Sequence, residues 1–390
     1  MSFLRTSFTG SALTPDPKVS FVVPCYKLGH LLRECVESIL GQTFPDFEVL
    51  IMDDCSPDNT PEVARSFSDP RVIHIRNEPN LRHLGNYNKG ISLARGNYIW
   101  LISADDKLRR PYVLERFVGV MDAHPGIGFA FCPGVGLMHG QETHVLEYTV
   151  QENRDVIFRG QNLFLRLLDE NSILAASGLV RRECYEMLGM FPLDLPFSGD
   201  WYLWCLFSLN YDAAYFAEPM VCYREHELSM SNELSAQDVS LCLQNDLLLF
   251  WRIRKILAAR NDALLLRACD EAISECYAQA LAGKRKYKGV PCSLSLAAFN
   301  ESLCQHSSTE SRGRLQASTL AKAGDHCRWQ HKYQRAGEFY ASALRLAPLN
   351  PVLWCKYAVC QASGWNSLSG AKGQSKHRPR AKHKIHKLLK

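Results

Sequence analysis

The sequence predicts an α/β protein whose N-terminal half forms a doubly wound parallel sheet and whose C-terminal third is α-helical. Over residues 19–132, strand-like apolar runs alternate one by one with amphipathic helical segments. The runs are almost continuously apolar, which is typical of parallel strands covered by helices on both faces. Residues 235–285 and 317–365 instead have the apolar patterning of helices.

The elements of the α/β part follow one another along the chain without a break. In such sheets ligands bind beyond the carboxyl ends of the strands, so the residues after each strand are candidate site residues. We expect strands at 19–26, 47–54, 71–76, 97–102 and 128–134, with helices at 29–40, 59–68, 83–95 and 111–123 between them.

Changes in composition divide the chain further. Residues 286–315 are rich in Ser, Gly and polar side chains, which favours a linker. The domains expected from these changes are an N-terminal extension (1–17), an α/β domain (18–230), a helical region with linker (231–315), a repeat-like helical segment (316–366) and a basic, disordered tail (367–390).

Composition places the 390-residue chain among ordinary globular proteins, since 46% of its residues are hydrophobic and 22% are charged. No apolar run is long enough to predict a membrane-spanning helix, and the first 18 residues lack the apolar core of a signal peptide. The 15 cysteines are spread through the chain without a CxxC pair, which favours reduced thiols. These observations predict a cytoplasmic protein.

The net charge of +5 is concentrated at one end of the chain. Residues 371–390 contain eight Lys and Arg side chains and no acid, which leaves 37 basic and 40 acidic side chains elsewhere. A near-neutral body argues against nucleic acid as a partner, and the tail has no Phe, Trp or Tyr to stack on bases. The tail suits the anionic inner face of a membrane, where lipid-linked acceptors would lie. A solvated tail without a partner is the alternative.

Two pairs of adjacent acids follow two of the expected strands: Asp53 and Asp54 after the second, Asp105 and Asp106 after the fourth. Adjacent carboxylates repel each other unless a cation or hydrogen-bond donors neutralise them. Mg²⁺ or Mn²⁺ bound together with phosphate oxygens would supply that neutralisation. The alternative is a solvated turn in which one of the acids caps the helix that begins near Pro111.

The order of these motifs resembles the inverting family 2 glycosyltransferases with the GT-A fold. The resemblance covers residues 18–106 and includes Pro-x-Tyr at Pro24 and Tyr26, "SILGQT" from Ser38, "DDCSPD" from Asp53, and Asn-x-Gly at Asn88. It ends with "SADD" at 103–106, where many members of the family have an acid in place of the serine.

This resemblance implies a nucleoside-diphosphate-sugar donor, UDP- or dTDP-linked, and a Mg²⁺ or Mn²⁺ ion. Asp54 would accept a hydrogen bond from the base, and Asp106 would bind the metal at the diphosphate. The donor-binding residues it implies are Pro24, Tyr26, Asp53, Asp54, Asn88 and Asp105, and the metal ligands are Asp106 and His226.

The family pattern resumes at 177–228, where Asp200 in "SGDWYLW" and the "YREH" stretch that ends at His226 match it. Inverting transfer needs one base that takes the proton from the acceptor hydroxyl. Asp200 is the candidate for that base, and a helix N-cap is the alternative reading of the same residue. Arg224 is expected to pair with phosphate or with Asp200.

Residues 317–350 resemble a tetratricopeptide repeat, with Gly324, Tyr333, Tyr340 and Pro348 at its characteristic positions. A second, partial repeat begins near Trp354. We expect antiparallel helix pairs that pack on 235–285, with the two tyrosines and Trp354 at the helix contacts. A generic helical hairpin is the alternative.

Together these features predict a cytoplasmic, metal-dependent, inverting glycosyltransferase, peripheral to the membrane if the tail binds it. Its acceptor would be a hydroxyl of a glycan or glycolipid in surface polysaccharide or lipid-linked oligosaccharide synthesis. Two alternatives stay open. The repeats could bind a protein, which would make the chain a protein glycosyltransferase, or the chain could be a non-catalytic scaffold.

Overall fold

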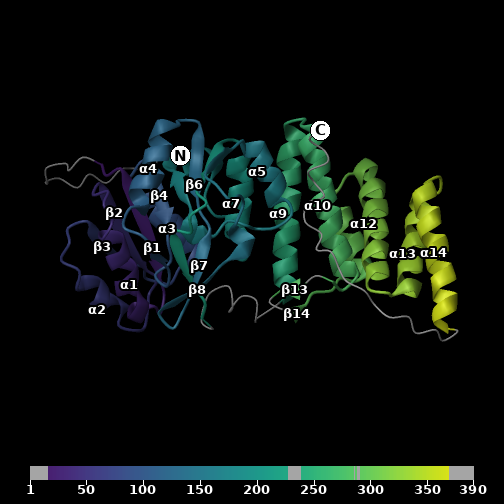
Figure 1. The fold of residues 1–390 in the computed structure, drawn as a ribbon, viewed down its shortest axis with the longest axis horizontal. Helices are drawn as coiled ribbons and strands as arrows, with labels where there is room; N and C mark the ends of the chain where they lie inside the picture. The colour runs from purple at the N-terminus through teal and green to yellow at the C-terminus, as the bar shows by residue number, and fades with distance from the viewer. Residues whose placement is uncertain (1–15, 227–238, 285, 288–289, 369–390) are drawn as a thin grey trace.

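The computed structural model describes residues 16–226, 239–284, 286–287 and 290–368. It confirms the predicted fold class, because an α/β domain with the GT-A arrangement is followed by an all-helical region. The helices of that region stand side by side in a row that leads away from the sheet (Figure 1). The extension up to residue 15 and the tail from residue 369 lie outside the described residues, so the predictions made for them stay predictions.

The main sheet has eight strands in the order β3-β2-β1-β4-β10-β6-β11-β9. Strands β1 to β4 are parallel, β10 runs antiparallel to β4 and β6, and β9 runs antiparallel to β11. The strands are β1 (Val19–Cys25), β2 (Phe47–Asp53), β3 (Val72–Arg76), β4 (Tyr98–Leu101), β6 (Ile127–Phe131), β9 (Val156–Phe158), β10 (Leu179–Arg181) and β11 (Asp212–Tyr215).

A second, four-stranded sheet in the order β5-β12-β7-β8 adjoins the carboxyl end of β4. Its strand β5 begins directly after Asp106, so the second acidic pair lies in the short connection between the two sheets. The strands of this sheet are β5 (Lys107–Leu108), β7 (Gly134–Met138), β8 (Gln141–Val145) and β12 (Val221–Arg224).

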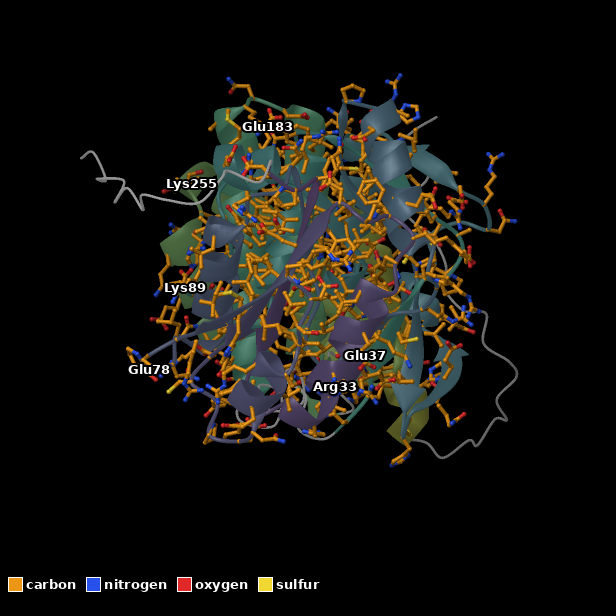
Figure 2. All side chains as sticks on the ribbon, turned by 90° about the vertical axis from the view of Figure 1, so that its left-hand side faces the viewer. Arg33, Glu37, Glu78, Lys89, Glu183 and Lys255 are labelled. Carbon is orange, nitrogen blue, oxygen red and sulfur yellow. The ribbon has the colours of Figure 1, made fainter. Side chains whose placement is uncertain are left out.

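Helices cover both faces of the main sheet because the buried strands alternate their side chains between two cores. Val19, Phe21 and Val23 belong to one core with α1 (Gly29–Leu40), α2 (Thr60–Arg65) and α4 (Val113–Ala123). Arg33 and Glu37 lie on the outer face of α1, where they form an ion pair (Figure 2). The other face is covered by α3 (Arg82–Leu93), α5 (Gly160–Leu167), α6 (Arg182–Leu188) and α7 (Gly199–Ser208).

The core on the α7 side continues into the helical region without interruption. Trp201 of α7 packs edge-on against Phe250 of α9, with ring centroids 5.2 Å apart. The helices after the α/β domain are α9 (Val239–Ala259), α10 (Ala263–Leu281), α11 (Leu296–His306), α12 (Thr309–Trp329), α13 (Tyr333–Leu346) and α14 (Pro351–Leu368). None of the described helices combines the length and apolar character needed to cross a membrane.

The stretch 286–315, expected as a linker, contains a short hairpin of β13 (Lys286–Tyr287) and β14 (Val290–Pro291), then α11 and the start of α12. Phe299 and Leu303 of α11 are buried in the same core as α7 and α9. Despite its polar composition, this stretch therefore includes a packed helix and is not only a linker.

Helices α12, α13 and α14 share a separate small core, and α12 also packs against α10. Tyr340 is fully buried against Gly324, as expected for a helix contact, and Tyr333 lies at the edge of this core. The prediction for Trp354 is wrong: its side chain is 52% exposed, because Leu353 and Cys360 face the core instead. The tetratricopeptide assignment itself stays a prediction.

Candidate active site

The carboxyl ends of β1, β2 and β4 meet at one edge of the main sheet because these strands are parallel neighbours. Backbone hydrogen bonds hold the connections after them together: Asp54 N–H donates to Cys25 O (2.9 Å), and Ala104 N–H donates to Pro24 O (3.1 Å). Both acidic pairs and Tyr26 therefore lie at this edge, where a doubly wound sheet binds its ligands.

Asp53 is fully buried and has a partner on each carboxylate oxygen. Its Oδ2 accepts a hydrogen bond from Arg76 Nη1 (2.7 Å) on the neighbouring strand β3, and His74 Nε2 lies 3.4 Å away. Its Oδ1 accepts one from Ser56 N–H (2.9 Å). These contacts fix the turn after β2, so Asp53 shapes this wall of the site.

Asp54 is also buried and holds the start of α3. Its Oδ1 accepts hydrogen bonds from Asn77 Nδ2 (2.9 Å) and from Leu81 N–H (2.8 Å), and its backbone carbonyl accepts one from Asn80 Nδ2 (2.6 Å). Donors from three residues between β3 and α3 thus position Asp54 on the wall next to Tyr26.

Tyr26 and Asn88, both predicted to bind the donor, have different surroundings. The Tyr26 side chain is 45% exposed, and the ammonium group of Lys27 lies 5.0 Å from the centre of its ring. Asn88 on α3 uses its amide on the backbone of Phe191, donating to its carbonyl (2.8 Å) and accepting from its N–H (3.0 Å). Tyr26 offers an open ring surface, whereas Asn88 fastens the loop that leads to Asp200.

The second acidic pair has fewer partners. Asp105 Oδ2 lies 2.9 Å from His226 Nε2, while its Oδ1 is buried and has no hydrogen-bond partner among the described residues. Asp106 Oδ1 accepts a hydrogen bond from Arg224 N–H (2.9 Å). Burial and the neighbouring charge of Asp105 raise the pKa of Asp106 well above its usual range.

Arg224 ends β12 beside this pair but does not pair with Asp200. Its Nε donates to the backbone carbonyl of Asp105 (2.8 Å), and its Nη2 pairs with Glu34 of α1. Glu34 also pairs with Lys107. Burial would raise the pKa of Glu34, but the hydrogen bond from Lys107 and the charges of Lys107 and Arg224 outweigh it and lower that pKa. Glu34 thus pairs with two cations that lie next to the two aspartates.

The residues at this point fit a divalent cation that arrives with a diphosphate. Two adjacent carboxylates and an imidazole are oxygen and nitrogen donors of the kind that Mg²⁺ and Mn²⁺ accept. The buried, unpartnered Oδ1 of Asp105 is a position where a ligand atom would supply the missing contact. No three His, Cys, Asp or Glu side chains converge as a ready ligand set in the described part of the chain. His226, predicted as a ligand beside Asp106, contacts Asp105 instead.

Asp200 lies in the first turn of α7, two residues after Ser198, which occupies the N-cap position. Its Oδ1 accepts a hydrogen bond from Trp201 N–H (2.7 Å), and its Oδ2 accepts one from Asn171 Nδ2 (3.1 Å). Burial raises the pKa of Asp200, and the hydrogen bonds from Asn171 and Trp201 act in the opposite direction. A carboxylate that is both a stronger base than usual and held in place suits proton transfer.

Two tyrosines that no sequence motif indicated, Tyr87 and Tyr148, are affected by the charges of both Asp200 and the second acidic pair. Burial raises the pKa of Tyr87 above its usual range, and the charges of Asp105, Asp200 and Asp106 add to the effect. The pKa of Tyr148 is raised by burial and by several charges that include those of Asp200 and Asp106. The charges of Asp200 and of Asp106 thus act on the same two phenols. Tyr87 stands next to Asn88 in the matched motif, which is the signal that could have found it.

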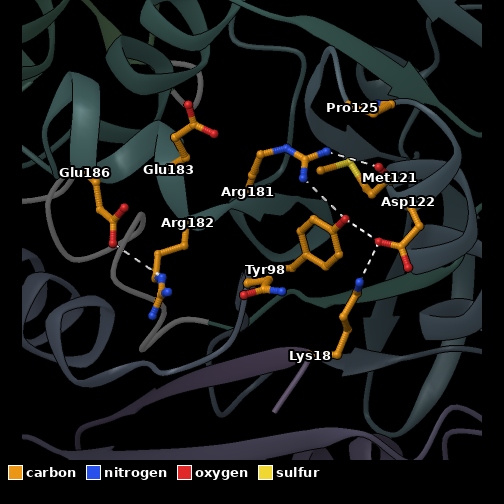
Figure 3. A pocket seen from close by; sticks show the side chains of 10 residues that line it. Lys18, Tyr98, Met121, Asp122, Pro125, Arg181, Arg182, Glu183 and Glu186 are labelled. Atoms are coloured by element: carbon orange, nitrogen blue, oxygen red, sulfur yellow. Dashed lines mark hydrogen bonds and ion pairs between the residues drawn. The ribbon is translucent and has the colours of Figure 1, made fainter. Parts of the chain in front are cut away.

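A hollow of about 330 Å³ lies at the opposite, amino-terminal edge of β4 (Figure 3). The Lys18 ammonium pairs with Asp122 (2.8 Å), and Tyr98 Oη donates to the same carboxylate (2.6 Å). Arg181 Nη2 donates to the carbonyl of Met121 (3.0 Å). Lys18, Asp122 and Arg181 thus have protein partners within this hollow, which argues for a structural role.

Comparison with known proteins agrees with this geometry. Residues 20–181 match the family model "Glycosyl transferase family 2" and form a domain of that family. Glycosyltransferase GlyG of Streptococcus pneumoniae is 40% identical over 116 residues, which are 28% of this chain and 38% of that protein. Succinoglycan biosynthesis protein ExoO of Rhizobium meliloti is 38% identical over 112 residues, 29% of this chain and 32% of that protein.

The curated relatives are matched over part of their length, since the aligned region spans 36%, 16% and 38% of three of them. Among solved structures, S. aureus TarS 1–349 in complex with UDP-GlcNAc superposes with a TM-score of 0.55 at 17% identity. The superposition covers 90% of this chain and 92% of that one. Both the α/β domain and much of the helical region therefore follow a known fold.

Proposed function

We propose that this protein is a metal-dependent, inverting glycosyltransferase that moves a sugar from a nucleoside-diphosphate sugar to a hydroxyl of a glycan or glycolipid. The observation that carries the proposal is the buried acidic pair after β4, where Asp105 Oδ1 has no hydrogen-bond partner among the described residues. Asp200, whose charge acts on Tyr87 together with the charges of that pair, supports it as the candidate base. A family 2 glycosyltransferase domain over residues 20–181 supports the same reaction class.

In the proposed reaction the acceptor hydroxyl binds next to Asp200. As the hydroxyl oxygen forms its bond to the anomeric carbon, the Asp200 carboxylate takes the proton. The bond from that carbon to the donor phosphate breaks on the opposite face, and its electron pair leaves with the nucleoside diphosphate. One displacement inverts the anomeric configuration, and no covalent enzyme intermediate is needed.

The other site residues bind and orient the donor in this proposal. Tyr26 offers an exposed ring to the nucleoside, and Asp54 lies beside it as the acceptor of a hydrogen bond from the base. Asp105, Asp106 and His226 would hold the Mg²⁺ or Mn²⁺ ion together with the diphosphate. When bound, that ion neutralises the charge that develops on the leaving diphosphate.

The donor and acceptor classes rest on the relatives. TarS 1–349 binds UDP-GlcNAc, which makes a UDP-linked sugar the first donor to test and a dTDP-linked sugar the second. ExoO belongs to succinoglycan biosynthesis, which favours a polysaccharide hydroxyl as the acceptor. Surface polysaccharide synthesis is therefore the proposed setting.

Asp200→Asn tests the proposal, because the amide keeps the shape of the side chain but cannot accept the proton. Transfer from UDP- or dTDP-sugars with Mn²⁺ should fall by about 10²–10⁴-fold, the usual contribution of a positioned base. Calorimetry should show UDP binding close to that of the wild type. Glu186→Gln, which removes an exposed carboxylate on α6, is the matched control. Equal losses of binding and turnover would assign Asp200 a structural role and contradict the proposal.

A further inference from the structure

The N-cap residue of α7 directs its side chain away from its own helix. Ser198 makes no side-chain capping hydrogen bond to α7. Its hydroxyl instead donates to Asp246 Oδ1 of α9, a contact in which both residues are buried. A serine at this position usually accepts a hydrogen bond from the first turn of the helix. Here the contact joins the helix that carries Asp200 to the helical region.

The residue before Ser198 is fixed by the same helix. Phe197 N–H donates to Asn245 Oδ1 (3.1 Å), and Asn245 Nδ2 donates back to the Leu241 carbonyl (3.0 Å) within α9. Asn245 and Asp246 are buried at 3% and 1% exposure, which is rare for a polar pair. Two consecutive residues before Asp200 thus depend on side chains that lie beyond the α/β domain.

Asn171 holds the Asp200 carboxylate from the other side. Its Nδ2 donates to Asp200 Oδ2 (3.1 Å), whereas its buried Oδ1 has no hydrogen-bond partner among the described residues. A buried amide with one unpaired atom costs folding free energy. The one side-chain hydrogen bond that Asn171 makes among the described residues goes to the candidate base, which indicates that this contact is the reason for its presence.

We propose that Asn171 and Asp246 are positioning residues for Asp200: Asn171 orients its carboxylate, and Asp246 fixes the start of the helix that bears it. The inference rests on the proposed function, since it assigns the purpose of both residues to the reaction of Asp200. It makes the first helix of the helical region a working part of the active site.

Asn171 and Asp246 shift the pKa of Asp200 in opposite directions. The hydrogen bond from Asn171 lowers the pKa of Asp200, and the like charge of Asp246 raises it. The Trp201 N–H also lowers the pKa of Asp200. The charge of Asp200 in turn helps to raise the pKa values of three nearby groups: the phenols of Tyr87 and Tyr148 and the thiol of Cys205. Burial remains the main cause of the raised pKa of Asp200.

These opposite effects can be measured as opposite shifts in the pH dependence of kcat, which residues with a purely structural role would not produce. The base must be ionised, so the acidic limb of the profile of kcat against pH reports the pKa of Asp200. Asp246→Asn keeps an oxygen for Ser198 but removes the like charge, so the limb should move to lower pH. Asn171→Ala removes a hydrogen bond that favours the carboxylate, so the limb should move to higher pH.

Asn171→Ala should also lower kcat at the optimum, by about 10-fold to 100-fold for a misplaced base. Asp246→Asn keeps the acceptor for Ser198, so its main effect should be the shift of the limb. The dissociation constant for UDP with Mn²⁺ should stay within about twofold of the wild type, because neither residue lies at the donor edge. Asn210→Ala is the control: Asn210 lies just beyond the other end of α7, where it donates to the Leu206 carbonyl. Its profile should match that of the wild type.

Each outcome separates this inference from the proposed function. If Asp200→Asn abolishes transfer while the limb stays fixed in both variants, the positioning inference is overturned and the proposed function stands. If Asp200→Asn retains transfer, the proposed function fails first. Ser198→Ala tests the role of Asp246 independently, and serves if Asp246→Asn does not fold, because it removes the hydrogen bond between the two residues from the α7 side. It should lower kcat with UDP binding unchanged, and an unaltered kcat would overturn the role of Asp246.

Discussion

The two acidic pairs look alike in the sequence and differ in the structure. Asp53 ends β2 and Asp54 follows it, and the two are held by donors from Arg76, Ser56 and Asn77. Asp105 and Asp106 follow β4 and make fewer contacts with the protein. One oxygen of Asp105 is buried and has no hydrogen-bond partner in the part of the chain that the structure describes. The pKa of Asp106 is raised by burial and by the charge of Asp105.

This difference indicates that the first pair shapes the site, whereas the second pair is the point where a ligand would bind. A carboxylate whose partners are all internal is already stabilised, and it shapes the surface that a ligand meets. A buried pair of like charges with an open oxygen is stabilised when a cation and its phosphate ligand arrive. The first pair should therefore matter most for folding and the second most for metal-dependent donor binding.

The largest expected effect comes from Asp106→Asn. Removing one of the two carboxylates that would hold the cation should abolish the enhancement of UDP binding by Mn²⁺ and lower transfer by at least about 10³-fold. Calorimetric titration of UDP with and without Mn²⁺, together with a transfer assay, measures both.

Asp122→Asn is the control for that variant. Asp122 pairs with Lys18 and Tyr98 in the hollow of Figure 3, at the opposite edge of the sheet. Its loss should leave metal-dependent UDP binding intact. If Asp106→Asn behaves like Asp122→Asn, the two acidic pairs do not differ as proposed and the metal site lies elsewhere.

In the absence of metal, a substitution in the first pair should lower the free energy of unfolding more than a substitution in the second pair. Asp54→Ala leaves the Leu81 N–H and one N–H of the buried Asn77 amide without an acceptor, so the free energy of unfolding should fall by about 2 kcal/mol. Asp106→Asn removes a like-charge contact and can still accept from Arg224 N–H, so it should leave stability unchanged or raise it. Urea denaturation in EDTA measures both, and a marked loss for Asp106→Asn would contradict the comparison.

The edge with the two acidic pairs could be predicted because its residues follow directly after apolar runs. Once β1, β2 and β4 are recognised as parallel neighbours, Pro24, Asp53 and Asp105 must lie at the same edge. The partners of the acids were not predictable in the same way. Arg76 and Asn77 reach Asp53 and Asp54 from the end of the next strand, 23 residues away.

The Asp200 side depends on contacts that no local pattern encodes. Asn171 lies 29 residues before Asp200, and Asp246 lies 48 residues after Ser198. The signal that could have found Asp246 is the polar pair "ND" within the otherwise apolar "LCLQNDLLLF". The prediction that Trp354 lies at a helix contact was wrong for a related reason. A residue pattern identifies helices, but which face of the last helix is buried depends on how its neighbours pack.

A smaller effect is expected from Glu34→Gln, which disturbs the second pair indirectly. Glu34 pairs with Lys107 and Arg224, next to Asp105 and Asp106. Without that charge the two cations can neutralise the aspartates and compete with a divalent ion. Affinity for Mn²⁺ in the presence of UDP should fall by about 10-fold, the lower end of what residues behind metal ligands contribute. Glu37→Gln, on the exposed face of the same helix, is the control.

The smallest effect concerns a carboxylate of the helical region that resembles the first pair. Glu275 of α10 lies 2.7 Å from His326 Nε2 and accepts a hydrogen bond from Gln279 Nε2 (2.8 Å). Burial alone would raise its pKa, but these hydrogen bonds and the charges of His326 and Lys322 lower it to about 2. A folded-state pKa below the unfolded value of 4.5 means that Glu275 stabilises the fold above that pH. This contribution is lost as the pH falls from about 4.5 towards 2.

The stability difference between wild type and Glu275→Gln should therefore shrink over that range. Thermal melts between pH 3 and 6 can measure this difference, with Glu271→Gln on the same helix as the control. Because Glu275 is 40% exposed, the difference should be small, and transfer activity should not change. A pH-independent difference would show that this carboxylate, unlike Asp53 and Asp54, owes nothing to its partners.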